Sequence, residues 1–326
     1  MNDRLGAHPG FGCAYLAGSL NHLAPDAPVP DSSDVDVHIV QRGRGAWAPA
    51  EEVGGLLLRC TVQNIDLSSV EAVLRHPFEA EPLLFGAILA DPRSALAATR
   101  AGAAADFGHP QWVRARCEGA IASAHEWFDR VRPDDASGSD AAVPLFAWGV
   151  SSLAACLAVS RRREPAGRKC LLMAREVLQE AGRPDLQDAL LGLLGVDGFT
   201  GEQARRYHAE SMRLFDAALQ VHHTFVPCDN LLRPLCRANL RAGGEELLEA
   251  GFHREAMWRV QRTYFPVCQV LIADAPEDER PRYRRMWDAF RNDIGLATAA
   301  QVRDRLAAAR SLAGEIRTVA LEAAAG

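Results

Sequence analysis

The sequence predicts an α+β protein, with a small α/β unit at the start of the chain and a larger all-helical unit after it. Short apolar runs bounded by turn residues, which are typical of strands, occur in the first part of the chain. After Asp91-Pro92, alanine, leucine and arginine recur at helical spacing. The length of 326 residues suits two domains. We therefore expect a first domain over residues 1–92 and a helical-bundle domain over residues 93–326.

The expected elements follow from these patterns. Strands are predicted over residues 12–16, 35–40 and 56–65, and the last of them, LLLRCTVQNI, has β-branched residues in its second half. Ser68 or Ser69 can cap a helix that begins near Val70. Further helices are expected over residues 93–105, 112–131, 143–159, 169–181, 203–219, 230–248, 254–272, 280–290 and 298–321.

Composition excludes several function classes. The net charge of -6 gives no basic footprint for nucleic acid or for an anionic membrane. We find no charged-then-apolar start and no apolar run of about 18 residues, so neither a signal peptide nor a membrane span is expected. The 8 cysteines are scattered without a CxxC pair, which disfavours a zinc or redox motif and indicates a reducing, cytoplasmic location.

Two aspartates lie at the start of the second predicted strand, in the segment Ser33-Asp34-Val35-Asp36. Residues i and i+2 of a strand point to the same side, so Asp34 and Asp36 are expected to project together. Two carboxylates that close repel each other unless a proton or a cation lies between them. Mg²⁺ prefers such oxygen ligands and keeps several waters that a phosphate can replace. The pair therefore predicts a Mg²⁺ site.

A Gly-Ser turn follows the first predicted strand. Gly18 permits a tight turn and close approach of a ligand to the backbone. Ser19 offers a hydroxyl and a main-chain N–H to phosphate oxygens. A strand, this turn and a second strand with two aspartates together fit a metal-bridged polyphosphate site.

At these residues the sequence resembles the DNA polymerase β-like nucleotidyltransferases, whose signature is Gly-Ser, a loop and Ser-Asp-x-Asp. The likeness is greatest to the stand-alone branch that includes kanamycin nucleotidyltransferase. It implies a catalytic domain with a mixed sheet, in which Gly18 and Ser19 hold a nucleoside triphosphate, ATP being expected, and Asp34 and Asp36 bind Mg²⁺. It also implies transfer of a nucleoside monophosphate to a hydroxyl of a small-molecule acceptor, such as an aminoglycoside, with release of pyrophosphate.

The family places a third acid on the next strand, where it takes the proton of the acceptor. In the segment CTVQNID, Asp66 is the acid within reach, and the alternatives Gln63 and Asn64 cannot act as a base. An acid from the helical domain is the other source. Glu176 and Glu255 are candidates for that role, against the alternative that each is a solvated charge on a helix.

Basic residues of the second unit are almost all arginines. Lys169 is the single lysine of the chain, and we attribute this to composition. The run Arg161-Arg162-Arg163, followed by Glu164-Pro165, is interpreted as a solvated linker, with contact to a triphosphate tail as the alternative.

Three functions stay open at this point. The first is a small-molecule nucleotidyltransferase, and the second adenylylates a protein partner, as antitoxins of this family do. The third is a nucleotide-binding or interaction protein with weak catalysis. The long helical domain argues against the second, and the position of Asp66 discriminates the first from the third. A nucleic-acid or membrane partner is not expected, and a homodimer is compatible with the sequence.

Overall fold

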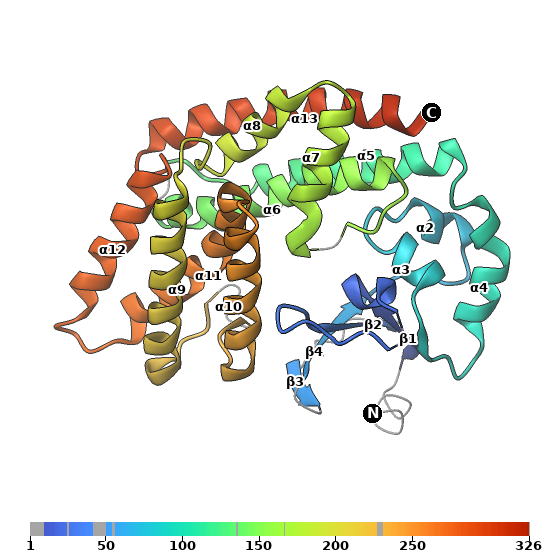
Figure 1. Cartoon of the computed structure of the whole chain (residues 1–326), viewed down its shortest axis with the longest axis horizontal. Helices are drawn as coiled ribbons and strands as arrows, with labels where there is room; N and C mark the ends of the chain where they lie inside the picture. Colours follow the sequence, from blue (N-terminus) through green and yellow to red (C-terminus); the bar gives the residue numbers. More distant parts are fainter. Residues whose placement is uncertain are drawn as a thin grey trace.

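The computed structural model describes residues 10–24, 26–41, 50–53, 56–134, 136–165, 167–226 and 231–325. Figure 1 shows a small sheet with short helices around it, long helices that cross above, and a further group of helices beside the sheet. The chain is therefore α+β, as the sequence predicts, with the sheet at its start and helices through the rest.

The sheet has 5 strands in the order β3-β4-β2-β1-β5. Their bounds are Phe11–Ala17 (β1), Val35–Gln41 (β2), Ala50–Val53 (β3), Leu56–Gln63 (β4) and Ile88–Ala90 (β5). β2 and β4 are parallel and the other pairs are antiparallel, so the sheet is mixed. The three strands expected from periodicity are β1, β2 and β4, whereas β3 was not predicted.

The register of β1 on β2 positions the Gly-Ser turn. Ala17, the last residue of β1, pairs with Asp36 near the start of β2. The chain then turns into a short 3-10 helix, η1 (Gly18–His22). The turn and the two aspartates therefore meet at one end of the central hairpin, although a long loop separates them in sequence.

Three short helices pack against one face of the sheet: α2 (Val70–Arg75), α3 (Ala80–Phe85) and α4 (Ala95–Ala103). Their apolar side chains share a core with β1 and β2 that extends as far as Phe107. Ser69, rather than Ser68, caps α2 by accepting a hydrogen bond from the Ala72 N–H at 3.1 Å. Because α4 shares this core, the sheet unit continues past the expected boundary at residue 92.

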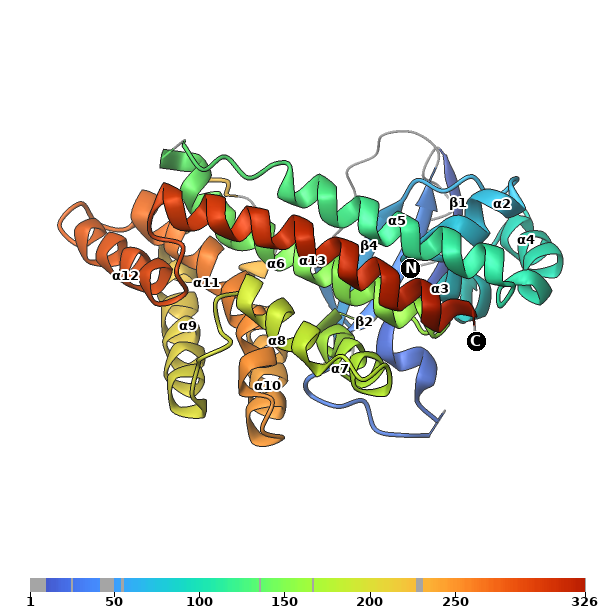
Figure 2. The same cartoon turned by 90° about the horizontal axis from the view of Figure 1, so that it is seen from above.

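The remaining helices form the second unit. They are α5 (Pro110–Phe128), α6 (Ala136–Ser160), α7 (Cys170–Glu180), α8 (Pro184–Leu193), α9 (Gly201–Val221), α10 (Pro234–Glu249), α11 (His253–Asp274), α12 (Arg280–Asp293) and α13 (Ala299–Ala325). Figure 2 shows α13 lying along α5 and α6, and the three share one large core. α8 is not among the helices expected from the sequence.

The segment Asp140–Ser160 of α6 is long and apolar enough to cross a membrane by length and composition, whereas no such segment was expected from the sequence. In the folded chain 89% of that apolar window is buried inside the protein. Its surroundings are α5, α7, α11 and α13, so α6 serves as a core helix of the bundle.

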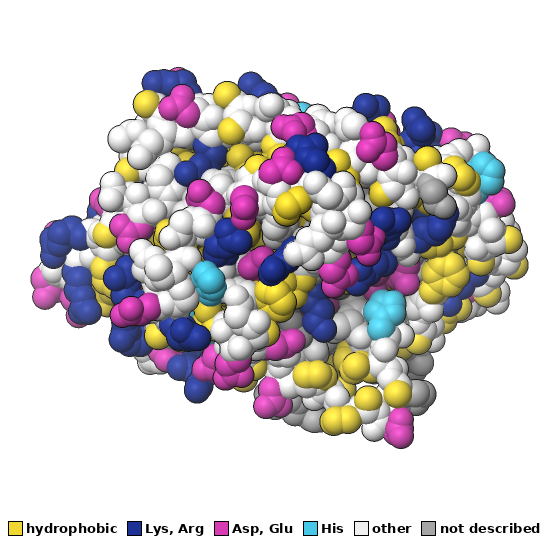
Figure 3. Space-filling model, turned by 45° about the horizontal axis from the view of Figure 1, so that its top comes forward, with side chains coloured by type: hydrophobic (Ala, Val, Ile, Leu, Met, Phe, Trp, Pro, Cys, Tyr) yellow, Lys and Arg dark blue, Asp and Glu magenta, His cyan; other side chains and the backbone are white. Residues whose placement is uncertain are grey.

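Buried polar contacts join the two units. Arg116 of α5 is 2% exposed and donates hydrogen bonds to the carbonyls of Leu74 at 2.9 Å and Phe107 at 2.8 Å. On the other side of the sheet unit, Asn239 of α10 donates to the carbonyl of Ser32 at 2.8 Å. The Arg116 bonds hold α2 and Phe107 against α5, and the Asn239 bond holds the loop before β2 against α10. On the face seen in Figure 3, acidic and basic side chains are interspersed, without a continuous basic stripe.

Candidate functional site

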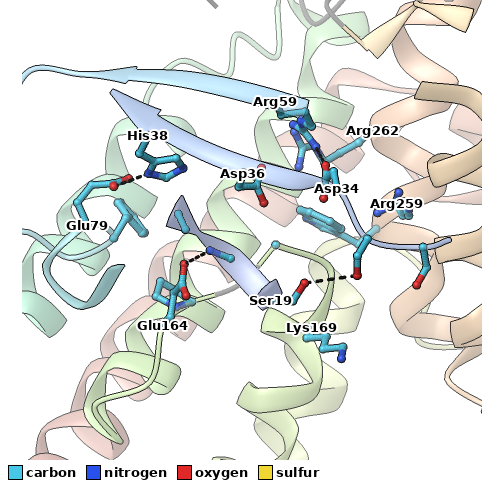
Figure 4. A pocket seen from close by; sticks show the side chains of 18 residues that line it. Ser19, Asp34, Asp36, His38, Arg59, Glu79, Glu164, Lys169, Arg259 and Arg262 are labelled. Atoms are coloured by element: carbon cyan, nitrogen blue, oxygen red, sulfur yellow. Dashed lines mark hydrogen bonds and ion pairs between the residues drawn. The ribbon is translucent and has the colours of Figure 1, made fainter. Parts of the chain in front are cut away.

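A cleft of about 240 Å³ lies between the end of β1, the start of β2 and the helical unit. Gly18, Ser19, Asp34 and Asp36 line it from the sheet side. The helical unit faces them with the side chains of Glu164, Lys169, Arg259 and Arg262 (Figure 4). Four of the five site residues expected from the sequence therefore meet in one cleft.

Gly18 has a backbone that only glycine adopts easily, with φ of 77°. A Cβ at this position would also lie 2.7 Å from Asp36 Oδ2, closer than two such atoms approach in proteins. Its N–H donates a hydrogen bond of 2.6 Å to Glu164 Oε1. The turn thus lies directly against one aspartate, and its amide already holds an anionic oxygen.

The two aspartates have different surroundings. Asp34 accepts a hydrogen bond of 2.8 Å from Arg59 Nη1, and Arg59 is the residue of β4 that pairs with Asp36. Burial, and then the charge of Asp34, raise the pKa of Asp36 to about 6. The surroundings of Asp36 therefore disfavour its ionised form, and a cation beside it would stabilise that form.

The structure does not bring Asp66 to this cleft. β2 and β4 run in parallel, so the start of β2 lies beside the start of β4, and Asp66 comes after the far end of β4. Its carboxylate is exposed and accepts hydrogen bonds from the N–H of Ser68 at 3.0 Å and from its hydroxyl at 2.6 Å. The residue of β4 that pairs with Asp36 is Arg59, which is not an acid. We therefore withdraw Asp66 as the candidate general base.

A buried polar network continues the line of the aspartates along β2. His38 lies two residues after Asp36 and bonds through Nδ1 to Glu79 Oε2 at 2.6 Å. The same carboxylate accepts hydrogen bonds from Tyr15 at 2.7 Å and Gln63 at 2.6 Å. Glu79 is 4% exposed. This network was not predicted from the sequence, although the alternation Asp-x-Asp-x-His was a signal that His38 shares the aspartates' side of the strand.

The ionisation of this network follows from its contacts. Burial lowers the pKa of His38, but the hydrogen bond and charge of Glu79 outweigh that effect, so the pKa is raised overall. Burial raises the pKa of Glu79, and the bond and charge of His38 outweigh it in turn, so that pKa is lowered. His38 and Glu79 are thus a mutually stabilised ion pair at the edge of the cleft.

The segment that joins α6 to α7 contributes two more residues. Glu164 is 7% exposed and lies against the Gly-Ser turn, so the interpretation of this segment as a solvated linker is wrong for that residue. Lys169, the single lysine of the chain, lines the same cleft. Its isolation among arginines was a usable signal that we attributed to composition.

Two arginines of α11 complete the cleft on the helical side. Arg259 donates to the carbonyl of Asn239 at 2.9 Å and to its side-chain oxygen at 2.7 Å. Asn239 in turn holds the loop before Asp34 through Ser32. The guanidinium of Arg262 stacks over the ring of Trp258 at 4.8 Å. Both arginines line the cleft together with the two aspartates (Figure 4).

The other acids considered from the sequence lie elsewhere. Glu176 forms an exposed ion pair with Arg163 at 2.6 Å. Glu255 is 3% exposed, accepts a hydrogen bond from Gln187 at 3.3 Å, and so is not the solvated charge that was one interpretation of it. Neither is among the described residues that line the cleft.

Comparison with models of known protein families and with curated proteins gave no match. The cleft combines the Gly-Ser turn, two adjacent carboxylates and basic side chains on the opposite wall. This arrangement is suited to a metal ion and a polyphosphate.

Proposed function

We propose that this protein is a metal-dependent nucleotidyltransferase. It would transfer a nucleoside monophosphate from a nucleoside triphosphate, ATP being the first candidate, to a hydroxyl of a small-molecule acceptor. The observation that carries the proposal is the contact between Gly18 and Asp36, where a Cβ would come within 2.7 Å of the carboxylate. The contact places the Gly18 N–H, which suits a phosphate oxygen, next to the Asp36 carboxylate, which suits a cation.

Asp34 and Asp36 fit a divalent cation. Asp36 lies in β2, Asp34 directly precedes it, and both line the cleft. Burial and the charge of Asp34 raise the pKa of Asp36, so its ionised form is disfavoured without a cation. Mg²⁺ is the natural candidate because it prefers oxygen ligands and is commonly held by one or two carboxylates together with phosphates. When bound, Mg²⁺ would neutralise charge on the triphosphate and help to orient it.

The protein's own contribution would be positioning and charge neutralisation. The Ser19 hydroxyl is suited to phosphate oxygens, and so is the Gly18 N–H once Glu164 moves off it. Lys169, Arg259 and Arg262 line the opposite wall, where they would balance the charge of the phosphates. Phosphoryl and nucleotidyl transfers depend mostly on such positioning.

The charged residues that line the cleft indicate which class of acceptor it suits. Among the described residues, the carboxylates Asp34, Asp36, Glu79 and Glu164 are matched in number by Arg59, Lys169, Arg259 and Arg262. The cleft has no acidic excess that would select a polycationic acceptor over a neutral one. We therefore propose a hydroxylated small molecule as the acceptor class, of which an aminoglycoside is one member.

One observation favours the second candidate, a protein that binds nucleotide without transferring it. Arg59 stands beside Asp36 on the neighbouring strand and bonds to Asp34 at 2.8 Å. A cation at that position cannot act as a general base. Release of pyrophosphate distinguishes the candidates, because only a transferase converts the bound triphosphate.

Calorimetry with ATP and GTP, with and without Mg²⁺, tests the binding step. The wild type is expected to bind in a Mg²⁺-dependent manner, and the variant Asp34→Asn/Asp36→Asn is expected to lose that binding. Asp26→Asn is a matched control, because Asp26 is an exposed aspartate in the loop between the turn and β2. Absence of binding by the wild type, or equal binding by the double variant, would overturn the proposal.

A further inference from the structure

A second cluster of ligand-type side chains lies next to the Gly-Ser turn. His22 comes from η1, Glu81 from α3 and Glu164 from the segment between α6 and α7. One ligand atom of each lies within 4.8 Å of the others. His22 Nε2 is 3.4 Å from Glu164 Oε2. Two ligands of a tetrahedral ion at about 2.0–2.2 Å are separated by about 3.3–3.6 Å, so this pair already has the spacing of a metal site.

An independent observation points to a missing partner. The Oε2 atoms of Glu81 and Glu164 are both buried and accept no hydrogen bond from the described residues, and Glu164 Oε2 has the 3.4 Å ion-pair contact with His22. Glu164 as a whole is 7% exposed. Buried polar atoms without a partner are rare in folded proteins because they lose their hydration without compensation. Two such oxygens beside an imidazole nitrogen are a donor set that a cation would satisfy.

We propose that His22, Glu81 and Glu164 form a second divalent-cation site, separate from Asp34 and Asp36, that takes a first-row transition ion such as Zn²⁺. An imidazole nitrogen with carboxylate oxygens suits Zn²⁺ or Co²⁺, whereas Mg²⁺ prefers oxygen alone. Three protein ligands leave a fourth position for water. The three ligands come from separate segments, so the ion would tie the helical unit to the sheet unit.

The site has a consequence for the Gly-Ser turn, and this consequence rests on the proposed function. Glu164 uses its other oxygen, Oε1, to accept the Gly18 N–H at 2.6 Å. A metal ligand is oriented by the hydrogen bonds of its remaining atoms. An ion on Oε2 therefore holds Glu164 on the amide that a phosphate oxygen would use. Occupation of the second site opposes nucleotide binding.

Titration with Co²⁺, followed by its visible absorption and by competition with Zn²⁺, tests the site directly. The Asp34→Asn/Asp36→Asn variant is the background, because it removes the other carboxylate pair without touching these ligands. Binding of one Co²⁺ that Zn²⁺ displaces is expected. His22→Ala or Glu81→Gln, added to this background, should weaken Co²⁺ binding by about tenfold or more.

Glu71→Gln is the matched control, since Glu71 is an exposed glutamate of the same unit that pairs with Arg75. His22 has a side chain that is 57% exposed, so its replacement is expected to leave the fold intact, and circular dichroism checks this. No Co²⁺ binding in the background variant, or binding unaffected by His22→Ala and Glu81→Gln, would overturn the site. Neither readout involves nucleotide, so failure of the proposed function would be seen separately.

Discussion

Replacement of Gly18 by alanine separates backbone strain from damage to the cleft. Gly18 has φ of 77°, and a left-handed backbone costs a residue with a Cβ about 1–2 kcal/mol. The added Cβ would also lie 2.7 Å from Asp36 Oδ2, at the end of a side chain that can rotate away. We therefore expect Gly18→Ala to fold with about 1–2 kcal/mol less stability, and with Asp36 turned out of place.

Loss of one interaction with a charged group is worth about 1.5–3 kcal/mol, which corresponds to a drop of about 10- to 150-fold in affinity for Mg²⁺–ATP. Gly182→Ala is the matched control, because Gly182 has φ of 69° and nothing within 4 Å of an added Cβ. It should lose the same stability in chemical denaturation and keep wild-type affinity in calorimetry. Wild-type affinity in Gly18→Ala would refute the reasoning.

Four further predictions concern charged groups. Because the pKa of Asp36 is raised to about 6, its ionised form opposes folding at higher pH, so Asp36→Asn without metal should be more stable than wild type at pH of about 7.5 by about 1–3 kcal/mol. That gain should vanish below a pH of about 4 in denaturation experiments, and no gain at the higher pH would contradict it. The pKa of His38 is raised from 6.5, so its ion pair contributes stability that is complete below that pH and is lost as the pH rises through the folded value. His38→Gln should lack this decline, and a wild-type pH profile of stability would argue against the ion pair. Glu164→Gln removes the negative charge beside the Gly18 N–H, which a phosphate oxygen would use. It should therefore tighten Mg²⁺–ATP binding about fivefold, or about 1 kcal/mol, in calorimetry without zinc. The exposed control Glu176→Gln should not, and equal affinities of the two variants would count against the role of that amide. Asp66→Asn should cost about 0.5–1.5 kcal/mol through its lost hydrogen bonds and leave nucleotide binding unchanged, whereas a tenfold weaker binding would return Asp66 to the site.

The hairpin that forms the site was predictable because its information is local. Apolar runs and turn residues located β1 and β2, and the period of two in a strand placed Asp34 and Asp36 on one side. Gly18 follows β1 directly, so an antiparallel hairpin brings it back to Asp36. The structure contains these strands and the pairing between them.

The failures have a common physical origin in long-range pairing. Whether Asp66 or Arg59 lies beside Asp36 depends on the direction and register of β4 against β2, and no local pattern encodes that register. Glu164 and Lys169 reach the cleft only because the helical unit folds back over the sheet. Glu255 was misjudged for the same reason, since its burial depends on contacts with another helix.

The most direct test of the central claim is a crystal structure of the protein with Mg²⁺ and a non-hydrolysable ATP analogue. The account predicts the triphosphate against Gly18 and Ser19, a metal ion held by Asp34 and Asp36, and Glu164 moved off the Gly18 amide. Nucleotide bound at another place, or a metal ion that does not contact either aspartate, would contradict the account.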